Sequence, residues 1–600
     1  MHNGIAVLDF GGQYAHLIAN RVRRLHAYSE VFGPGADPSE IEGFSGIIFS
    51  GGPSSVYDSV QPEFNPAHLN VRVPILGLCY GHQLLCQCLG GEVSPGDVRE
   101  YGSAALAIRS GTRIFEGLGS SETVWMSHGD VVIRLPDGFE VLGDTPDCPT
   151  AAVGDVRRHI YGLQFHPEVA HTPRGMDILD NFLKICETPR TWTMAGYSKT
   201  VMQEIRDQAG DRNVFLLVSG GVDSSVAFVL FNEALGADRV LGLHIDNGFM
   251  RKNETAHVET ILRQEGFSNL IVEDASEDFL LSVEGIVEPE EKRQAIGRTF
   301  IEVKDRVLAG LNLEPDDWLL GQGTLYPDTI ESGGTEHSAL IKTHHNRIDL
   351  IEELIAQGHI IEPLAHLYKD EVRDLGIQVG LPESMVWRQP FPGPGLSVRC
   401  LCSTGEKEQN NDLRHPEQQA GRLAEKAGLS LKILPIKSVG VQGDFRTYAH
   451  PAVVWGEADW AVLEELSTQI TNTVSEINRV VYLLSPDSPP ELRLKRAFLT
   501  RQRLDLLRAS DALAMDGLVR EELVQSVSQM PTVLLPLTSD GYQEAIVLRP
   551  VETPDFMTAR FSELSRTFLK SLAAKILALD GIEAVFYDVT HKPPGTVEWE

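Results

Sequence analysis

Short apolar runs alternate with longer amphipathic stretches over the first two thirds of the chain. Within residues 1–187 the apolar runs are Ile5–Phe10, Gly46–Ser50, Pro74–Leu78 and Ile160–Phe165. Runs of this length between amphipathic stretches predict buried strands connected by helices. The alternation therefore predicts a doubly wound α/β domain.

The same alternation resumes after residues 188–198, which we interpret as a linker. Strands are expected at Val214–Val218, Val240–Ile245, Asn269–Val272 and Trp318–Gly321. Residues 199–402 are therefore expected to form a second doubly wound α/β domain. The run Pro390–Gly395 holds too much proline and glycine for regular structure, so we expect a loop or hinge there.

The last third of the chain contains a faint internal repeat. After a polar connector at 403–428, the run Ile433–Ile436 is echoed by Leu534–Leu537, and Ile477–Tyr482 is echoed by Ile582–Tyr587 at nearly the same offset. Each copy is expected to run strand, strand, helix, strand. Residues 429–600 are thus predicted to be a duplicated small α+β domain, with copies at about 429–490 and 531–600. A chance similarity of two small α+β units is the alternative.

Composition narrows the possible partners. The chain has 600 residues, 42% hydrophobic and 23% charged, as expected for several globular domains. Its 84 acidic and 52 basic residues give a formal net charge of −32. We expect this surface to repel nucleic acid and anionic membranes, so positive charge for a nucleotide must be local or come from Mg²⁺. Seven scattered cysteines, no membrane-length apolar stretch and no basic leader predict a cytoplasmic protein.

A small polar turn separates a predicted strand from a predicted helix at Val226–Ala234. It consists of Ser219, Gly220, Gly221, Val222, Asp223, Ser224 and Ser225. Such a turn leaves backbone N–H groups free to surround an anion. It lacks the lysine of a phosphoryl-transfer loop, which favours a grip on the pyrophosphate of ATP during attack on the α phosphate. The alternative is an ordinary turn with N-capping residues.

A cysteine-centred group lies in the first domain. Cys79 follows a predicted strand, and glycines two before and two after it fit a sharp strand-to-helix elbow. His166 and Glu168 share one face of an extended stretch, so Glu168 can orient His166, which can take the thiol proton. Ser50–Pro53 offers backbone N–H groups for an oxyanion. Singly each feature is usually structural, but together they predict a nucleophile with its base.

These motifs resemble class I (triad) glutamine amidotransferases over residues 1 to about 185. The resemblance implies that Cys79 forms a glutamyl thioester and releases ammonia. It also implies that Gln83 helps to hold glutamine. The amides of Gly52 and Tyr80 would stabilise the tetrahedral intermediate.

Residues 199–600 resemble the GMP synthetase family, including its N-type ATP pyrophosphatase domain. The motifs that carry the resemblance are the 219–225 turn, Asp246–Gly248, Gln322–Asp328, Ile341–Asn346, Lys369–Arg373, Pro390–Gly395, Ser438–Asp444 and Lys592–Glu600. It implies amination of xanthosine 5′-monophosphate (XMP) through an adenylyl intermediate, with ATP as co-substrate and glutamine as nitrogen donor. The alternatives are a related amidotransferase with another acceptor and a non-catalytic relative.

Position by position, the 219–225 turn is expected to hold pyrophosphate with Asp223 near Mg²⁺. Lys342 and Lys369 could neutralise phosphates, and Asp246 lies at a strand end where adenosine is expected. By resemblance the XMP-binding residues would be Arg293, Asp444, Gln543, Lys592 and Glu598. The alternatives are a solvated helix face for Lys369 and a surface charge for Lys592.

The repeat bears on oligomeric state, since one such unit mediates dimer formation in the family's shorter members. The substrate motifs are divided between the copies: Ser438–Asp444 in the first and Lys592–Glu600 in the second. We hypothesise that the copies pair within one chain and build a single acceptor site. A monomer would then suffice, and a homodimer is the alternative.

Overall fold

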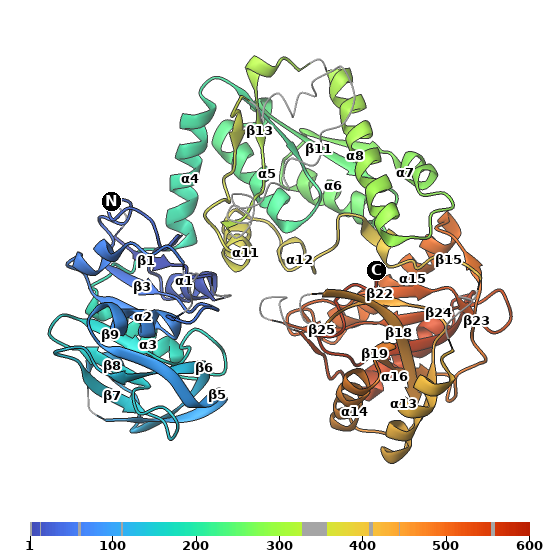
Figure 1. Cartoon of the computed structure of the whole chain (residues 1–600). Helices are drawn as coiled ribbons and strands as arrows, with labels where there is room; N and C mark the ends of the chain where they lie inside the picture. Colours follow the sequence, from blue (N-terminus) through green and yellow to red (C-terminus); the bar gives the residue numbers. More distant parts are fainter. Residues whose placement is uncertain are drawn as a thin grey trace. The chain divides into compact units, whose positions relative to one another are not determined.

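The computed structural model describes residues 3–11, 14–57, 62–109, 112–311, 313–326, 357–406, 412–442, 445–553 and 559–600 (Figure 1). Its contacts divide the chain into two compact units, Met1–Thr200 and Val201–Glu600. Among the described residues no helix has the length and apolarity to cross a membrane. Helix α4 (Met194–Ala209) begins inside the expected linker and continues into the second unit.

The first unit is built on a nine-stranded sheet. One half is parallel, in the order β2 (Ser29–Phe32), β1 (Ile5–Leu8), β3 (Gly46–Phe49), β4 (Ile75–Leu78) and β9 (Ile160–Leu163). The other half is antiparallel, in the order β8 (Ala152–Asp155), β7 (Glu140–Asp144), β5 (Glu92–Ile108) and β6 (Ser121–Arg134). Helices α1 (Ala15–Arg24), α2 (Tyr80–Cys88) and α3 (Gly175–Ile185) accompany the parallel half. The predicted α/β strands are confirmed, and the antiparallel half was not predicted.

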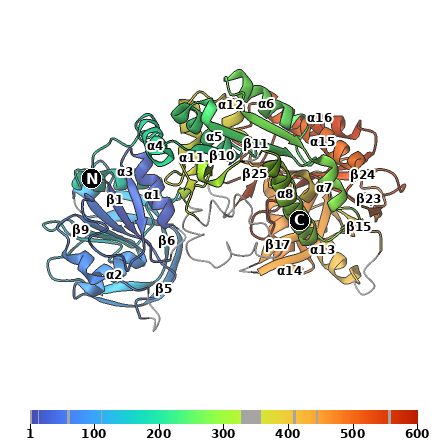
Figure 2. The same ribbon diagram turned by 90° about the horizontal axis from the view of Figure 1, so that it is seen from above.

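The second unit opens with a five-stranded, fully parallel sheet. Its order is β12 (Leu270–Asp274), β11 (Val240–Asp246), β10 (Asn213–Leu217), β13 (Trp318–Gly321) and β14 (Ile360–Ile361). All four predicted strands are present. From β10 the chain adds β11 and β12 on one side of the sheet and then β13 and β14 on the other, so the order of strands reverses at β10. Strand β11 and helix α5 (Val222–Leu235) lie beside β10 (Figure 2). The part of this region that the structure describes also contains α6 (Glu254–Gln264), α7 (Ser276–Ser282), α8 (Pro289–Leu311), α11 (Lys369–Gln378) and α12 (Glu383–Val386). This reversal is the position at which doubly wound sheets bind ligands.

The expected polar connector at 403–428 is only partly a connector. Residues 414–426 form helix α13, and its Ala420 and Ala424 are fully buried. The prediction was wrong here because most of this helix is polar. A narrow stripe of alanine and leucine is enough to pack it against strand β16 and helix α14.

The C-terminal sheet is a duplicated fold, and its strand order is symmetric about the centre of the sheet. Copy one contains β16 (Ser430–Ile433), β17 (Ser438–Gln442), β18 (Phe445–Trp455), α14 (Trp460–Thr473) and β19 (Ile477–Ser485). Copy two contains β22 (Thr532–Leu535), β23 (Leu537–Thr538), β24 (Glu544–Leu548), α16 (Arg566–Leu577) and β27 (Ile582–Asp588). The pairs β16–β18 in copy one and β22–β24 in copy two are antiparallel. The pairs β18–β19 and β24–β27 are parallel. The predicted duplication is confirmed.

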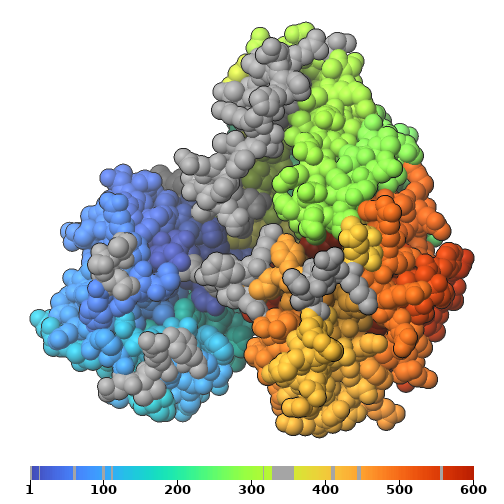
Figure 3. Space-filling view, turned by 45° about the vertical axis from the view of Figure 1, so that its right-hand side comes forward, coloured from blue at the N-terminus to red at the C-terminus, as the bar shows by residue number. Residues whose placement is uncertain are grey.

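The two copies join through β19 and β27, which pair antiparallel at the centre of the sheet. The register places Tyr482 opposite Tyr587, the residues that the repeat makes equivalent. When two equivalent residues pair with each other, a two-fold axis passes between them, as in the interface of a symmetric dimer. Helix α15 (Arg501–Arg520) precedes copy two, and its Arg508 donates to the carbonyl oxygen of Met250 at 2.9 Å. The parallel-sheet part and the duplicated part therefore meet within one unit (Figure 3).

Candidate functional site

The cysteine elbow has the geometry that its sequence predicts. Cys79 lies between β4 and α2 with φ 50° and ψ −107°, a strained conformation for a non-glycine residue. A Cβ atom on Gly77 would lie 2.6 Å from the carbonyl oxygen of Gly81, and one on Gly81 would lie 2.4 Å from that of Phe49. Both positions therefore require glycine. The turn holds the thiol at the N-terminus of a helix, where a thiolate is favoured.

His166 and Glu168 lie together beside Cys79, in the arrangement expected of a base and the acid that orients it. His166 Nδ1 and Glu168 Oε1 are 2.7 Å apart, and both side chains are buried. Burial disfavours the charged imidazole, but Glu168 and a hydrogen bond with Cys79 outweigh it and hold the pKa of His166 well above its usual range. Gly51 closes the site, because a Cβ atom there would lie 3.3 Å from His166 Cε1 and 3.7 Å from Cys79 Cβ. The imidazole is therefore held in a fixed position next to the Cys79 thiol.

Gln83 lies close to the thiol but is engaged with the protein. Its amide nitrogen donates to the carbonyl oxygen of Asp130 at 2.9 Å and to Gln164 Oε1 at 3.1 Å. Gln164 in turn contacts Cys79 Sγ at 3.7 Å. Sequence reasoning missed Gln164, although it lies two residues before His166 and so shares its face.

The two predicted oxyanion residues lie together beside Phe10. A Cβ atom on Gly52 would be 2.8 Å from the carbonyl oxygen of Phe10. The Tyr80 ring packs 5.5 Å from the Phe10 ring, measured between centroids. The backbone at Gly52 and Tyr80 is therefore held by close packing.

The raised pKa of His166 predicts a pH-dependent stability. A group whose pKa is raised on folding contributes fully below its unfolded value of about 6.5 and loses that contribution as pH rises through the folded value. The melting temperature of the first unit should therefore drop more on His166→Gln at about pH 6 than at about pH 10. Thermal melts across this range measure it. A difference that stays constant or grows with pH would contradict the imidazolium.

The 219–225 turn joins β10 to α5, as predicted. Gly220 has φ 80°, which favours glycine. The hydroxyl oxygens of Ser219 and Ser224 lie 3.0 Å apart, and Ser224 donates to the carbonyl oxygen of Gly221 at 3.2 Å. These hydrogen bonds connect the two ends of the turn. The turn also forms the N-terminus of helix α5, and helix N-termini bind anions.

Lys369 and Gly323 lie against this turn, and Asp246 lies at the end of the neighbouring strand β11. Lys369, the first residue of α11, reaches both carboxylate oxygens of Asp223 at 2.7 and 2.5 Å. Asp246 ends β11, and its Oδ1 accepts from the backbone N–H of Gly248 at 2.9 Å. Gly323 follows β13, and a Cβ atom there would lie 3.1 Å from the carbonyl carbon of Asp223. Lys342 lies outside the described residues.

Arg388 is a further cation at the turn that sequence reasoning missed. Its guanidinium donates to the carbonyl oxygen of Gly220 and pairs with Glu254 of α6. Burial lowers the pKa of Arg388 to about 10. Arg388 therefore links the turn to helix α6.

The substrate motifs of the two repeat copies lie side by side. Strand β17 of copy one pairs with the 592–600 segment of copy two: Val439 N donates to the Trp599 carbonyl oxygen at 2.9 Å, and Val441 N to that of Pro594 at 2.7 Å. Arg479 of copy one, fully buried, donates to the Glu598 carbonyl oxygen at 2.9 Å. The segment is therefore held by both copies.

Most of the predicted XMP-binding residues that can be described lie on or near this segment. Glu598 is paired with Arg399. The backbone of Lys592 pairs with Ala559 at 2.8 and 3.1 Å. The charge of Arg293, on α8, acts on Glu600.

Gln543 makes its contacts elsewhere in copy two, and Asp444 lies outside the described residues. The amide nitrogen of Gln543 donates to the Ile582 carbonyl oxygen at 3.4 Å, and its backbone N–H donates to Asp540 at 2.9 Å. No described contact joins Gln543 to the 592–600 segment.

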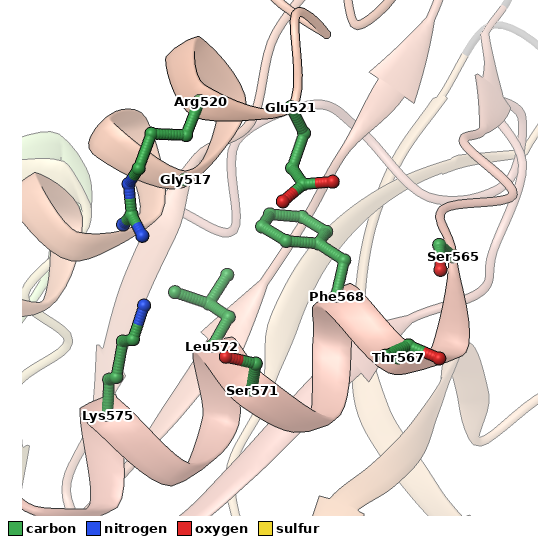
Figure 4. Close-up of a pocket in the computed structure, with 9 residues that line it drawn as sticks. All are labelled: Gly517, Arg520, Glu521, Ser565, Thr567, Phe568, Ser571, Leu572 and Lys575. Carbon is green, nitrogen blue, oxygen red and sulfur yellow. The ribbon is translucent and has the colours of Figure 1, made fainter.

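A surface pocket between α15 and α16 is separate from these residues. It is lined by Gly517, Arg520, Glu521, Ser565, Thr567, Phe568, Ser571, Leu572 and Lys575. Arg520 and Lys575 flank one side, and Phe568 lies beneath Glu521 on the other (Figure 4). None of the predicted substrate residues lines it.

Comparison with known proteins covers the whole chain. Residues 6–186 match the family model "Glutamine amidotransferase class-I", 194–285 match "NAD synthase", and 423–492 and 516–599 match "GMP synthase C terminal domain". The chain is 45% identical to a "Probable GMP synthase [glutamine-hydrolyzing]" of Leptospira interrogans, with 100% of both chains covered. It is also 45% identical to the GMP synthase of Heliobacterium modesticaldum, over 81% of this chain and 98% of that protein. The chain therefore belongs to the family of glutamine-hydrolysing GMP synthases.

Proposed function

We propose that each compact unit of this chain performs one half of a coupled reaction, which makes GMP from XMP, ATP and glutamine. The single observation that carries the proposal is the presence, in one chain, of a Cys79 elbow with its base and of a pyrophosphate turn. The full-length relatives bear GMP synthase names, so the alternative acceptor and the non-catalytic alternative are not favoured. We propose domain boundaries at 1–187, 199–402 and 429–600.

In the first half, the Cys79 thiolate attacks the side-chain amide carbon of glutamine. The backbone amides of Gly52 and Tyr80 stabilise the oxyanion, and His166 gives its proton to the departing ammonia. His166 then takes a proton from water, which attacks the thioester and releases glutamate. Glu168 holds the imidazole in the orientation that both proton transfers need.

In the second half, the 2-oxygen of XMP attacks the α phosphate of ATP and pyrophosphate departs. The N–H groups and hydroxyls of the 219–225 turn bind the pyrophosphate, and Lys369 compensates its growing charge. Ammonia then adds at C2 of the base, and AMP leaves. Asp246 lies at the strand end where the adenosine binds.

Asp223 fits the part of a Mg²⁺ ligand. Magnesium in nucleotide sites is held by one or two carboxylates together with phosphates, and Asp223 stands alone as a carboxylate in the turn. Among the described residues no group of three potential ligands could hold a metal by itself. Bound Mg²⁺ would neutralise charge on the phosphates, while Lys369 shares the Asp223 carboxylate.

A monomer is the expected solution state. The β19–β27 pairing already satisfies, within one chain, the interface that a symmetric dimer would make between two chains. Light scattering at working concentration should therefore give the mass of one chain. An obligate dimer that stays intact on dilution would contradict this. We also propose a cytoplasmic location, which the seven free cysteines support.

Product analysis tests the proposed reaction. The protein is mixed with ATP, Mg²⁺, XMP and glutamine, and the nucleotides are separated. We expect GMP, AMP and pyrophosphate in equal amounts. Orthophosphate from the terminal position of ATP, with no pyrophosphate, would refute attack at the α phosphate. Amination of another base but not of XMP would indicate a different acceptor.

A further inference from the structure

Two buried cations hold the 592–600 segment through alternate side chains. Arg399 Nε and Nη2 donate to the two carboxylate oxygens of Glu598 at 3.0 and 2.7 Å. Lys292 pairs with Glu600 and donates to the Ser397 carbonyl oxygen at 3.2 Å. Trp599, between the two acids, is buried in the sheet core and donates to Asp588 at 3.1 Å. Glu598, Trp599 and Glu600 thus each have a buried partner, and together these contacts fix the position of Glu598.

Arg399 is itself locked by its surroundings. Its side chain is fully buried, and its Cζ lies 5.3 Å from the centre of the Phe391 ring. Arg251 lies over the same ring at 4.9 Å and is paired with Asp511. Phe391 belongs to the Pro390–Gly395 run, where a Cβ atom on Gly395 would lie 2.4 Å from the Phe249 carbonyl oxygen. The run is closely packed at this point, so the guanidinium has a fixed position.

The exposure of the Arg399–Glu598 pair is asymmetric. The Glu598 side chain keeps 23% of its surface exposed, whereas that of Arg399 keeps 0%. A guanidinium that binds both carboxylate oxygens fixes the plane of the carboxylate. Each oxygen still has a lone pair available for a second donor. Glu598 therefore presents an oriented carboxylate on its open side.

From this geometry we infer that Arg399 is a positioning residue for the acceptor nucleotide. It orients Glu598 from the buried side, and Glu598 accepts a hydrogen bond from the nucleotide. The inference rests on the proposed function, in which Glu598 contacts XMP. It predicts that the guanidinium fork, and not only its positive charge, is required for normal affinity.

The test compares Arg399→Lys with a matched control, Arg503→Lys. Arg503 is also buried and binds both carboxylate oxygens of Glu544, with Nε–Oε1 2.9 Å and Nη2–Oε2 2.6 Å. Arg399→Lys should raise KM for XMP at least about tenfold, because one charge-assisted hydrogen bond is lost and the carboxylate is free to turn. KM for ATP should stay within about threefold. Arg503→Lys should show a similar loss of stability in urea without the selective change in KM.

A double-mutant cycle separates positioning from a general loss of structure. If Arg399 acts through Glu598, then Arg399→Lys in a Glu598→Gln background should raise KM for XMP by less than about twofold. Independent, additive effects would overturn the inference, as would equal KM changes in the two arginine variants. Calorimetric titration of each folded variant with XMP alone gives the same comparison without turnover. If the wild-type chain makes no GMP, the proposed function fails instead, and that outcome is seen before any variant is compared.

Discussion

Replacing Cys79 with alanine should abolish GMP formation from glutamine while leaving GMP formation from ammonium salts. In the proposed reaction the elbow and His166 activate Cys79 as the nucleophile. Without the thiol no thioester forms, so glutamine-dependent turnover should fall at least about a thousandfold. Added ammonia bypasses this step and reaches the adenylate directly. Parallel assays of GMP with the two nitrogen sources measure the effect.

Cys86 offers a matched control in the same helix. Burial raises the pKa of its thiol to about 12, so it is not a nucleophile at neutral pH. Cys86→Ala should retain turnover with both nitrogen sources, apart from a modest loss of stability. If Cys79→Ala lost activity equally with glutamine and ammonium, Cys79 would be a structural residue.

Replacing Lys369 with methionine should slow adenylate formation with either nitrogen source. Lys369 pairs with Asp223, and in the proposed reaction it also compensates the charge of the leaving pyrophosphate. Loss of such a charge inside a nucleotide site costs about 10²–10³ in rate. Release of pyrophosphate in single-turnover reactions with ATP, XMP and ammonium isolates the step.

Lys184 provides the comparison for an ordinary lysine–carboxylate pair. It lies 2.8 Å from Asp180 on α3, and its side chain is 57% exposed. Since exposed ion pairs contribute about 0–1 kcal/mol, Lys184→Met should behave like the wild type. Pyrophosphate release at the wild-type rate by Lys369→Met would mean that the lysine merely lies on a solvated helix face.

Local motifs explain why much of this molecule could be predicted from sequence. The elbow at Cys79 and the turn at 219–225 are each encoded by a few adjacent residues whose glycines leave little choice of conformation. The parallel strands are continuous apolar runs, which have a strong periodic signal. The roles assigned to individual residues remain predictions for the variants above.

Contacts between distant residues could not be predicted in this way. Arg399 and Glu598 are 199 positions apart, and the sequence around either residue gives no sign that the two are paired. Gln543 was predicted by resemblance to the family, and its described contacts are with Asp540 and Ile582 in its own repeat copy. Helix α13 escaped prediction because only a few small apolar side chains face the core. Each case depends on packing between residues that are distant in the sequence, and short sequence motifs carry no information about such packing.

The two-fold axis through Tyr482 and Tyr587 has an evolutionary consequence. In a dimer of identical chains every substitution appears on both sides, so neither side can drift alone. When one gene encodes both sides, selection can act on each separately. The offset that relates the tyrosines also relates Lys592, Glu598 and Glu600 to Asp487, Arg493 and Lys495. All three charges have the opposite sign, so the two halves have diverged at these positions in a way that identical chains of a dimer could not.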